Sequence, residues 1–340
     1  MEDHDDVPSI NPTDFFKSLK IIYNPETDTL TRLFTVPCTN PTNTDDDHHH
    51  SPAVSSQPVL TKDLPLNSSY HTWLRLFLPT GPPPSKKLPL IIYFHGGGFV
   101  FLSAANTMFH DFCSRVAVEL PAVVISVDYR LAPESRLPAA YDDAIDAIYW
   151  VREQALVVGD DKAHDLKNVW LREYVDFSTC YLMGLSAGGN IAYHASLRCL
   201  PLDLEPVKIV GMVLIQPFFS GVQRSGSEMR LGNDGMFTLD MSDAMWEYAL
   251  PKGADRDHEY CNPMVGDYGE KIGQLGRFLV CVRGGDMLRD RQMELVKMIE
   301  EKGGKVKCWF EEEGYHGVEL SDCEKASELL VKIKHFIYEK

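Results

Sequence analysis

The chain has 340 residues, of which 44% are hydrophobic and 24% charged, and its formal net charge at pH 7 is -16. A chain of this length and apolar content can bury one large core. The negative charge argues against nucleic acid and anionic membrane surfaces as partners, because both need a basic protein face. We therefore expect a neutral or cationic small molecule as the ligand.

The chain starts with an acidic segment, MEDHDDVPSI, which has neither the basic nor the apolar region of a secretory signal. No apolar run approaches the length of a membrane span. Eight cysteines are scattered without CxxC pairs, so neither a metal site nor a disulfide framework is expected. These features predict a cytosolic protein, a monomer or weak homodimer, that uses no metal and no organic cofactor.

The chain order predicts a short N-terminal unit, a loop and one large domain. Residues 1–37 contain a pattern typical of a helix followed by a hairpin, and they are expected to cover the site. Residues 38–60 are rich in Pro, Ser, Thr and Asp, which predicts a flexible loop. Residues 61–340 form the main domain. Within it, residues 218–260 are rich in Phe, Met and Trp, and either form cap elements or pack on the core as ordinary helices.

From residue 88 onward, short β-rich runs alternate with segments of helical periodicity. The expected strands are 88–95, 122–129, 179–184, 208–217, 277–284 and 305–312. The expected helices are 104–120, 139–156, 187–200, 289–303 and 322–340. Nearly continuous apolar strands separated by helices are typical of a mostly parallel sheet with helices on both faces. The ligand of such an α/β fold binds at the carboxyl ends of the strands.

Ser186 lies in the stretch GLSAG, after an expected strand and before an expected helix. A strand–turn–helix corner of this kind can hold a nucleophilic serine on a strained turn, with its hydroxyl exposed above the sheet. Gly184 and Gly188 let the strand and helix approach each other around that turn. The alternative is a glycine-rich corner in which the serine only caps the helix.

Three glycines, Gly96, Gly97 and Gly98, follow His95 directly after the expected strand 88–95. Such a loop exposes backbone N–H groups that can converge on an oxygen, as acyl transfer requires. The N–H of Ala187 would complete this oxyanion hole. Phosphate binding is the alternative, but no Lys-Ser/Thr pair follows the glycines to make a phosphate-binding loop.

A nucleophilic serine needs a histidine as base and an acid to orient that histidine. Of the four histidines after Ser186, only His316 lies in a loop directly after an expected strand; the others are His194, His258 and His335. For the acid, Asp286 follows the glycine pair at the end of strand 277–284. Asp290 is the alternative, and it suits the first turn of the next helix.

Six ordered motifs resemble the plant carboxylesterases, in the hormone-sensitive-lipase-like group of α/β-hydrolases. They are HGGGF (95–99), DYRLAPE (128–134), PAAYDDA (138–144), GLSAGGN (184–190), GGDMLRD (284–290) and GYHG (314–317). The resemblance implies an α/β-hydrolase fold with Ser186, Asp286 and His316 as the catalytic triad. It implies Gly96, Gly97 and Ala187 as oxyanion donors. It also implies an N-terminal lid, as in the related gibberellin receptors.

One residue departs from the family pattern: Leu185 stands before the nucleophile, where the family usually has an acidic residue. This change puts the substrate preference in doubt more than the catalysis. We expect the substrate pocket to be lined by Gly98, Leu185, Phe218, Phe219 and Trp246. Phe237 belongs to the same aromatic segment as the last three.

The function expected is hydrolysis of a short-chain, most simply acetyl, ester of a small hydrophobic molecule, such as an alkaloid or terpenoid ester of plant specialised metabolism. Two alternatives use the same pocket. One is a non-catalytic small-molecule receptor, which the presence of His316 disfavours, because the resembling receptors replace that histidine. The other is a lyase, cyclase or dehydratase of specialised metabolism.

Overall fold

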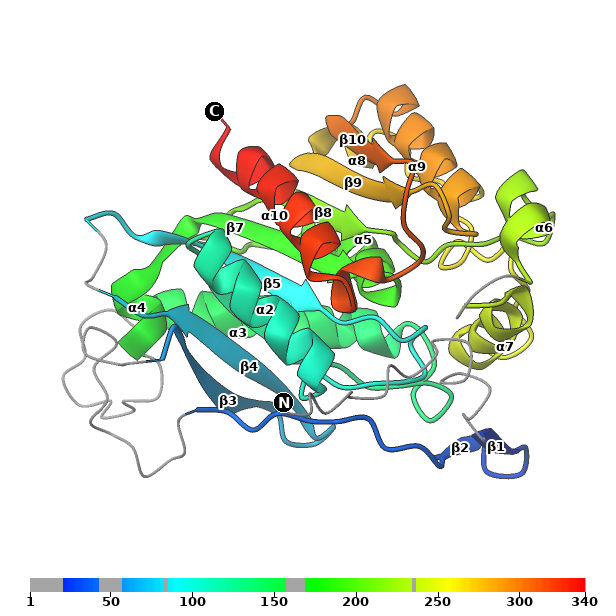
Figure 1. The fold of residues 1–340 in the computed structure, drawn as a ribbon, viewed down its shortest axis with the longest axis horizontal. Helices are drawn as coiled ribbons and strands as arrows, with labels where there is room; N and C mark the ends of the chain where they lie inside the picture. Colours follow the sequence, from blue (N-terminus) through cyan, green and yellow to red (C-terminus); the bar gives the residue numbers. More distant parts are fainter. Residues whose placement is uncertain (1–20, 43–56, 82–84, 157–168, 234–236, 340) are drawn as a thin grey trace, which may run out of the picture.

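The computed structural model of the chain describes residues 21–42, 57–81, 85–156, 169–233 and 237–339 (Figure 1). Its centre is a sheet of eight strands in the order β10-β9-β8-β7-β5-β6-β4-β3. The strands are β3 (Val59–Asn67), β4 (Thr72–Pro79), β5 (Leu88–Phe94), β6 (Val123–Asp128), β7 (Val175–Leu185), β8 (Ile209–Ile215), β9 (Arg277–Arg283) and β10 (Val306–Glu311). The ladder from β10 to β6 is parallel, whereas β4 pairs antiparallel with both β6 and β3.

Helices cover both faces of this sheet, as the alternating sequence pattern predicts (Figure 1). They are α2 (Thr107–Glu119), α3 (Ala139–Leu156), α4 (Val169–Tyr174), α5 (Ala187–Cys199), α6 (Gly226–Leu231), α7 (Leu239–Ala249), α8 (Lys271–Gln274), α9 (Arg289–Glu301), the 3-10 turn η3 (Val318–Leu320) and α10 (Cys323–Tyr338). Apolar residues of α2 and α10 form one core on one face, and those of α3, α5 and α9 contribute to a second core. Of the helices in the described ranges, none has both the length and the apolar character needed to cross a bilayer.

Two features of the sheet differ from the sequence prediction. Strand β7 begins at Val175, four positions before the expected 179. The first residues of β7 are polar, and a register shift between Pro89 and Leu90 of the neighbouring β5 lets them remain in the ladder. Within that stretch Asp176 accepts hydrogen bonds from the hydroxyls of Ser178 and Thr179. The antiparallel pair β3 and β4 has no counterpart among the expected strands.

The described part of the N-terminal unit is a hairpin of β1 (Ile21–Asn24) and β2 (Thr29–Arg32). It lies beside α7 in Figure 1, and the ring of Tyr23 is 5.1 Å from the ring of Tyr248 in that helix. Asp28 in its turn accepts hydrogen bonds of 3.0 and 2.8 Å from Arg136, and these hold the pKa of the Asp28 carboxyl well below its usual range. The hairpin is therefore attached to the segment 218–260. The helix expected before the hairpin lies outside the described residues.

Most of the expected loop 38–60 also lies outside the described residues, at 43–56. Its first residues are tied to the main domain, because Cys38 forms a β-bridge with Asn106. The N–H of Thr42 also donates a 2.8 Å hydrogen bond to the hydroxyl of Thr61. At the other end of the loop, β3 already starts at Val59.

His194 lies in an aromatic cluster that joins α5 to α3. Its ring stacks on Tyr141 at 4.7 Å and meets Tyr193, Phe219 and Tyr260 at 5.1 to 6.2 Å. Burial lowers the pKa of His194 to about 3, so the folded protein keeps this imidazole neutral. The ring therefore contributes to the core and not to proton transfer.

The buried imidazole predicts a specific pH dependence of stability. Below pH 6.5 the unfolded chain binds a proton at His194 that the folded chain does not bind, so stability falls as the pH falls from about 6.5 towards 3. Between pH 7 and pH 5 this group removes about 2 kcal/mol from the free energy of unfolding. Urea unfolding at both pH values should show that His194→Phe loses less stability than wild type. His335→Phe, at an exposed position of α10, is the control and should keep the wild-type difference. Equal pH differences for His194→Phe and wild type would contradict the assignment.

Candidate active site

Ser186 occupies the corner between β7 and α5 with φ of 56° and ψ of -118°. A non-glycine residue rarely adopts this conformation, so the surrounding structure must hold it there. The N–H of Ser186 donates a 2.9 Å hydrogen bond to the carbonyl of Ile215, at the end of β8. Its own carbonyl accepts a 2.9 Å hydrogen bond from the N–H of Phe218. The strained corner is thus anchored on both sides to the neighbouring strand.

Glycine is required at both positions flanking this corner. A Cβ on Gly184 would lie 2.1 Å from the carbonyl oxygen of Gly188. A Cβ on Gly188 would lie 1.9 Å from the carbonyl oxygen of Phe94, at the end of β5. Both distances are far below van der Waals contact and both involve backbone atoms, so helix α5 can approach β5 and β7 this closely only without these side chains.

The structure brings His316 and Asp286 to Ser186. Nε2 of His316 lies 2.9 Å from Oγ of Ser186, and Nδ1 lies 2.9 Å from Oδ2 of Asp286. An acceptor at Nδ1 favours the tautomer that carries its proton there. Nε2 is then the ring nitrogen able to accept a proton from the serine hydroxyl. The three residues expected as a triad therefore form one hydrogen-bonded line.

The carboxylate of Asp286 is fully buried and fixed by further donors. Oδ1 accepts a 2.9 Å hydrogen bond from the N–H of Leu288, and Oδ2 accepts a 2.8 Å bond from Nε2 of Gln292 in α9. The alternative acid, Asp290, points elsewhere. Its Oδ2 accepts a 2.6 Å hydrogen bond from the N–H of Ser227, which ties α9 to α6. Of the two acids that the sequence left as alternatives, Asp286 contacts His316, whereas Asp290 contacts α6.

The glycine loop after β5 lies next to the serine. A Cβ on Gly96 would be 3.4 Å from Cβ of Ser186. Across the described part of the chain, no protein group accepts a hydrogen bond from the N–H of Gly96, Gly97 or Ala187. Gly97 has a φ of 115°, and a Cβ there would lie 2.3 Å from the carbonyl oxygen of Phe101. The three N–H groups expected as oxyanion donors are therefore uncommitted, and Gly96 and Ala187 lie next to Ser186.

His95 supports this loop from below. Its ring stacks on Tyr129 at 4.2 Å, and its carbonyl accepts a 2.9 Å hydrogen bond from the Tyr129 hydroxyl. Its Nδ1 lies 2.7 Å from the carbonyl oxygen of Gly96. Burial lowers the pKa of His95, which keeps the ring neutral and suited to packing.

Aromatic side chains from the segment 218–260 pack around the site. Phe218 and Trp246 are fully buried, with their rings stacked 4.6 Å apart, and Phe237 lies 5.6 Å from Phe218. A Cβ on Gly98 would lie only 2.2 Å from Sδ of Met245, so α7 rests directly on the glycine loop. These contacts place the aromatic segment over the serine side of the sheet.

Leu185 and Phe219, which were also expected in the pocket, are core residues, as are Phe218 and Trp246. Leu185 is 3% exposed and belongs to the core on the α2 and α10 face, with its Cδ2 packed beneath Gly96. Phe219 is fully buried, and its ring meets Tyr193 of α5 at 5.6 Å. Leu185 thus provides an apolar support beneath the glycine loop at the position that is usually acidic.

Phe237, expected in the aromatic cap, stacks on the His316 ring with centroids 4.9 Å apart. Two other residues in contact with the site were not expected there. Gln292 binds Asp286, and Gln216 binds the backbone on both sides of His316. The available signal was position: Gln216 stands at the carboxyl end of the expected strand 208–217, at the edge of the sheet where the ligand is expected.

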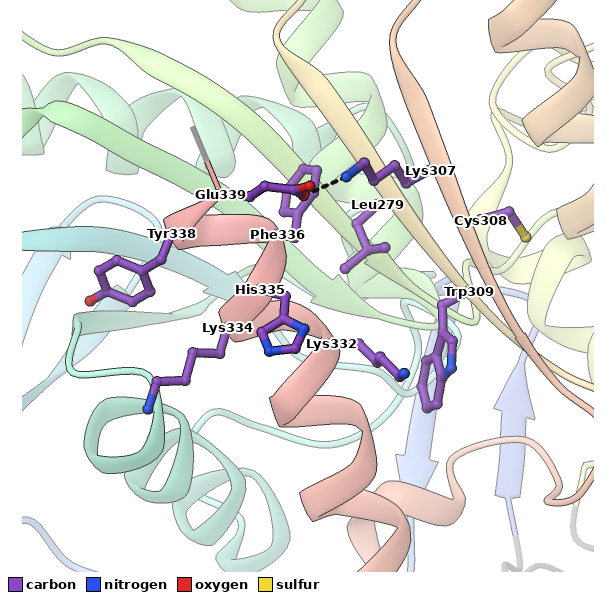
Figure 2. Close-up of a pocket in the computed structure, with 10 residues that line it drawn as sticks. All are labelled: Leu279, Lys307, Cys308, Trp309, Lys332, Lys334, His335, Phe336, Tyr338 and Glu339. Carbon is purple, nitrogen blue, oxygen red and sulfur yellow. Dashed lines mark hydrogen bonds and ion pairs between the residues drawn. The ribbon is translucent and has the colours of Figure 1, made fainter.

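A groove of about 730 Å³ lies away from this site, between the edge strand β10 and helix α10 (Figure 2). Its lining includes Lys307, Lys332, Lys334 and His335, so it is basic within an acidic protein. Trp309 and Phe336 contribute its apolar part, and Lys307 pairs with Glu339 across it. None of the residues expected in the active site lines this groove.

Comparison with known proteins identifies the family. Residues 91–320 match the model of an α/β-hydrolase fold family. The chain is 50% identical over 332 residues to a 3-O-acetylpapaveroxine carboxylesterase of Papaver somniferum, covering 95% of this chain and 99% of that one. It is 43% identical to carboxylesterase 20 of Arabidopsis thaliana, covering 96% and 97% of the two chains.

Two more distant relatives place the chain within the group. The gibberellin receptor of Oryza sativa subsp. japonica is 38% identical over 67% of this chain and 60% of the receptor. A solved esterase from the archaeon Pyrobaculum calidifontis superimposes with a TM-score of 0.67 at 26% identity, covering 82% of this chain and 84% of the esterase. The chain therefore belongs to the α/β-hydrolase fold family, in its hormone-sensitive-lipase-like group of plant carboxylesterases, and is a carboxylic ester hydrolase.

Proposed function

We propose that this enzyme hydrolyses a short-chain acyl ester, most simply an acetyl ester, of a small hydrophobic specialised metabolite. The proposed catalytic groups are Ser186, His316 and Asp286. The observation that carries this proposal is the line of two 2.9 Å contacts from the Asp286 carboxylate through the imidazole to the serine hydroxyl. A receptor that only binds its ligand needs no such base beside a serine, so this line favours hydrolysis.

In the proposed acylation step, Oγ of Ser186 attacks the ester carbonyl carbon while Nε2 of His316 takes the hydroxyl proton. Asp286 holds the Nδ1 proton and stabilises the positive charge that develops on the ring. The N–H groups of Gly96, Gly97 and Ala187 donate to the carbonyl oxygen as it becomes negative. The imidazolium then gives its proton to the departing alcohol, which leaves an acyl-serine.

Deacylation repeats the same steps with water as the nucleophile. His316 takes a proton from the water, and the hydroxide attacks the acyl carbonyl carbon. Collapse of the second tetrahedral intermediate breaks the acyl–serine bond, and the ring returns the proton to Oγ of Ser186. The products are a carboxylic acid and the alcohol, and the enzyme regains its starting state without a cofactor.

The packing around the site supports a short acyl group and an apolar alcohol. Met245 lies against Gly98, next to the proposed oxyanion donors, and we propose that it limits the room for a long acyl chain. Phe237, stacked on His316, is proposed to offer apolar surface to the rest of the substrate, with the fully buried Phe218 packed against it. A relative that is 50% identical is named for an acetylated substrate, 3-O-acetylpapaveroxine, and we extend that substrate class to this chain.

We further propose that residues 1–37 act as a lid, together with the cap elements in 218–260. The support is the attachment of the hairpin close to the glycine loop. Nε of Arg32 donates a 2.7 Å hydrogen bond to the carbonyl of Val100, just after that loop, and its guanidinium pairs with Glu134.

The cell compartment is proposed to be the cytosol, where the protein acts as a monomer or weak homodimer on its small-molecule ester. All eight cysteines are free thiols, and five of them are buried. Free thiols are typical of proteins from a reducing compartment.

Replacing the proposed nucleophile tests the central claim. Ser186→Ala should lower kcat/KM for p-nitrophenyl acetate about 10⁶-fold, because no acyl-enzyme can form. In wild type, kcat/KM for p-nitrophenyl octanoate should be about 10-fold or more below that for p-nitrophenyl acetate, because Met245 is proposed to limit the length of the acyl group. Initial rates with acetate, butyrate and octanoate esters measure both effects. Unchanged hydrolysis by the alanine variant would refute the mechanism.

The two neighbouring acids provide a matched pair of variants. Asp286→Asn should lower kcat about 10⁴-fold, because an amide at this position no longer favours the required imidazole tautomer. Asp290→Asn should keep a rate close to wild type, since Asp290 binds α6 and does not contact the histidine. Rates and thermal unfolding of both variants decide the assignment. Comparable losses of kcat in two folded variants would show that the acid has been misassigned.

A further inference from the structure

Gln216 directly follows β8 and is completely buried. Its φ of 43° places it in the left-handed region, which costs a non-glycine residue free energy. Burying a primary amide adds a further cost unless both its donor and its acceptor are satisfied. The chain thus carries a strained and buried polar residue at the edge of the sheet where the site lies.

The side-chain amide of Gln216 binds the backbone on both sides of His316. Nε2 donates a 3.0 Å hydrogen bond to the carbonyl of Tyr315, and Oε1 accepts a 2.8 Å hydrogen bond from the N–H of Gly317. One planar amide therefore fixes two peptide groups that flank the histidine. This arrangement resembles a single rung of a β-ladder, made with a side chain.

The segment that carries His316 needs such an external support. Gly314 and Gly317 have φ values of 103° and 76°, so the histidine sits between two residues with wide conformational freedom. The Tyr315 side chain is 41% exposed and its hydroxyl lies 2.9 Å from the Ser321 hydroxyl. Two further backbone hydrogen bonds hold the segment, from the N–H of Gly285 to the carbonyl of Gly314 and from the N–H of Val318 to the carbonyl of Tyr315. Gln216 adds a contact on each side of the histidine.

The same residue is also linked to the serine. The N–H of Ser186 bonds to the carbonyl of Ile215, which belongs to the peptide group that joins Ile215 to Gln216. The N–H of that same peptide group donates a 2.9 Å hydrogen bond to the carbonyl of Cys281 in β9. One rigid peptide unit therefore connects the backbone of the nucleophile with the side chain that holds the histidine segment.

We propose that Gln216 is a positioning residue for catalysis, which sets the 2.9 Å contact between Nε2 of His316 and Oγ of Ser186. This inference rests on the proposed function of these two residues. Gln216 touches neither the substrate carbonyl nor the transferred proton. It acts by holding the imidazole in line, and a displacement of about 1 Å at a reacting group can cost about 100-fold in rate.

Three substitutions separate the parts of this interaction. Gln216→Leu keeps similar bulk and removes both hydrogen bonds. Gln216→Glu keeps the reach and the acceptor for Gly317, but it loses the donor to Tyr315. Gln216→Asn keeps both polar groups on a side chain one methylene shorter, so the amide cannot reach both peptide groups.

A matched control removes a buried side-chain-to-backbone hydrogen bond far from the site. The hydroxyl of Tyr181 donates a 2.9 Å bond to the carbonyl of Ile337 in α10, and the side chain is buried. Tyr181→Phe should lower the thermal unfolding midpoint and leave kcat and KM unchanged. The same hydroxyl accepts a 3.1 Å hydrogen bond from Nη2 of Arg277, so this variant loses two hydrogen bonds, as Gln216→Leu does, and reports what that loss does to stability alone.

The kinetic test uses p-nitrophenyl acetate, with active sites counted by titration with a fluorophosphonate. For Gln216→Leu and Gln216→Asn we expect kcat per active site to fall 10- to 100-fold with KM nearly unchanged. The kcat per active site of Gln216→Glu should lie between the values of these two variants and that of wild type. If Gln216→Leu is folded and its kcat per active site equals that of wild type, the inference is overturned.

A second measurement does not depend on esterase activity. Amide hydrogen exchange at Gly317 should become faster in Gln216→Leu, because its N–H loses the acceptor Oε1, and should stay at the wild-type rate in Tyr181→Phe. Unchanged exchange at Gly317 in Gln216→Leu would overturn the inference whatever the rates are. If Ser186→Ala kept full activity while exchange at Gly317 increased in Gln216→Leu, the proposed mechanism would fail and the support of the His316 segment by Gln216 would stand.

Discussion

The site depends on the parallel hydrogen-bond ladder that joins five adjacent strands, β5, β7, β8, β9 and β10. Because the strands are parallel, their carboxyl ends meet at one edge of the sheet. Gly96, Ser186, Gln216, Asp286 and His316 each follow one of these strands within five residues. Residues up to 220 positions apart therefore meet because the ladder sets the spacing of the strand ends. The strand ends set the approximate positions of these residues, and the side-chain contacts set the final ones.

Close packing at the corner adds a second constraint. The space between β5, β7 and α5 admits no side chain at positions 184 and 188, so the glycines are a condition of the fold as well as of the exposed hydroxyl. The apolar Leu185 between them and the neutral His95 support the glycine loop from within the core. The strained serine is thus stable because every neighbour on the sheet side is rigid.

Local patterns explain which parts were predictable from the sequence. Five of the six strands from residue 88 onward were predictable because both faces of each are covered, which gives them apolar runs. The sixth, β10, lies at the edge of the sheet and is partly exposed. Ser186, Asp286 and His316 were found because each stands in a short motif directly after such a run. The antiparallel pair β3 and β4 was missed, since Pro65, beside a register shift, and the buried Arg75 interrupt its apolar pattern. Asp286 and Asp290 were separable only by their contacts.

The position of His316 in the sheet has one more consequence. The histidine follows β10, the outermost strand, which is bonded only to β9 in the described sheet, whereas the serine follows β7, which has a neighbour on each side. Edge strands open more readily than central ones. As temperature or denaturant concentration rises, His316 should therefore be displaced while the corner at Ser186 is still intact. The enzyme would then lose activity before it loses its core, and a brief stress would be reversible because only the rim of the sheet has to re-form.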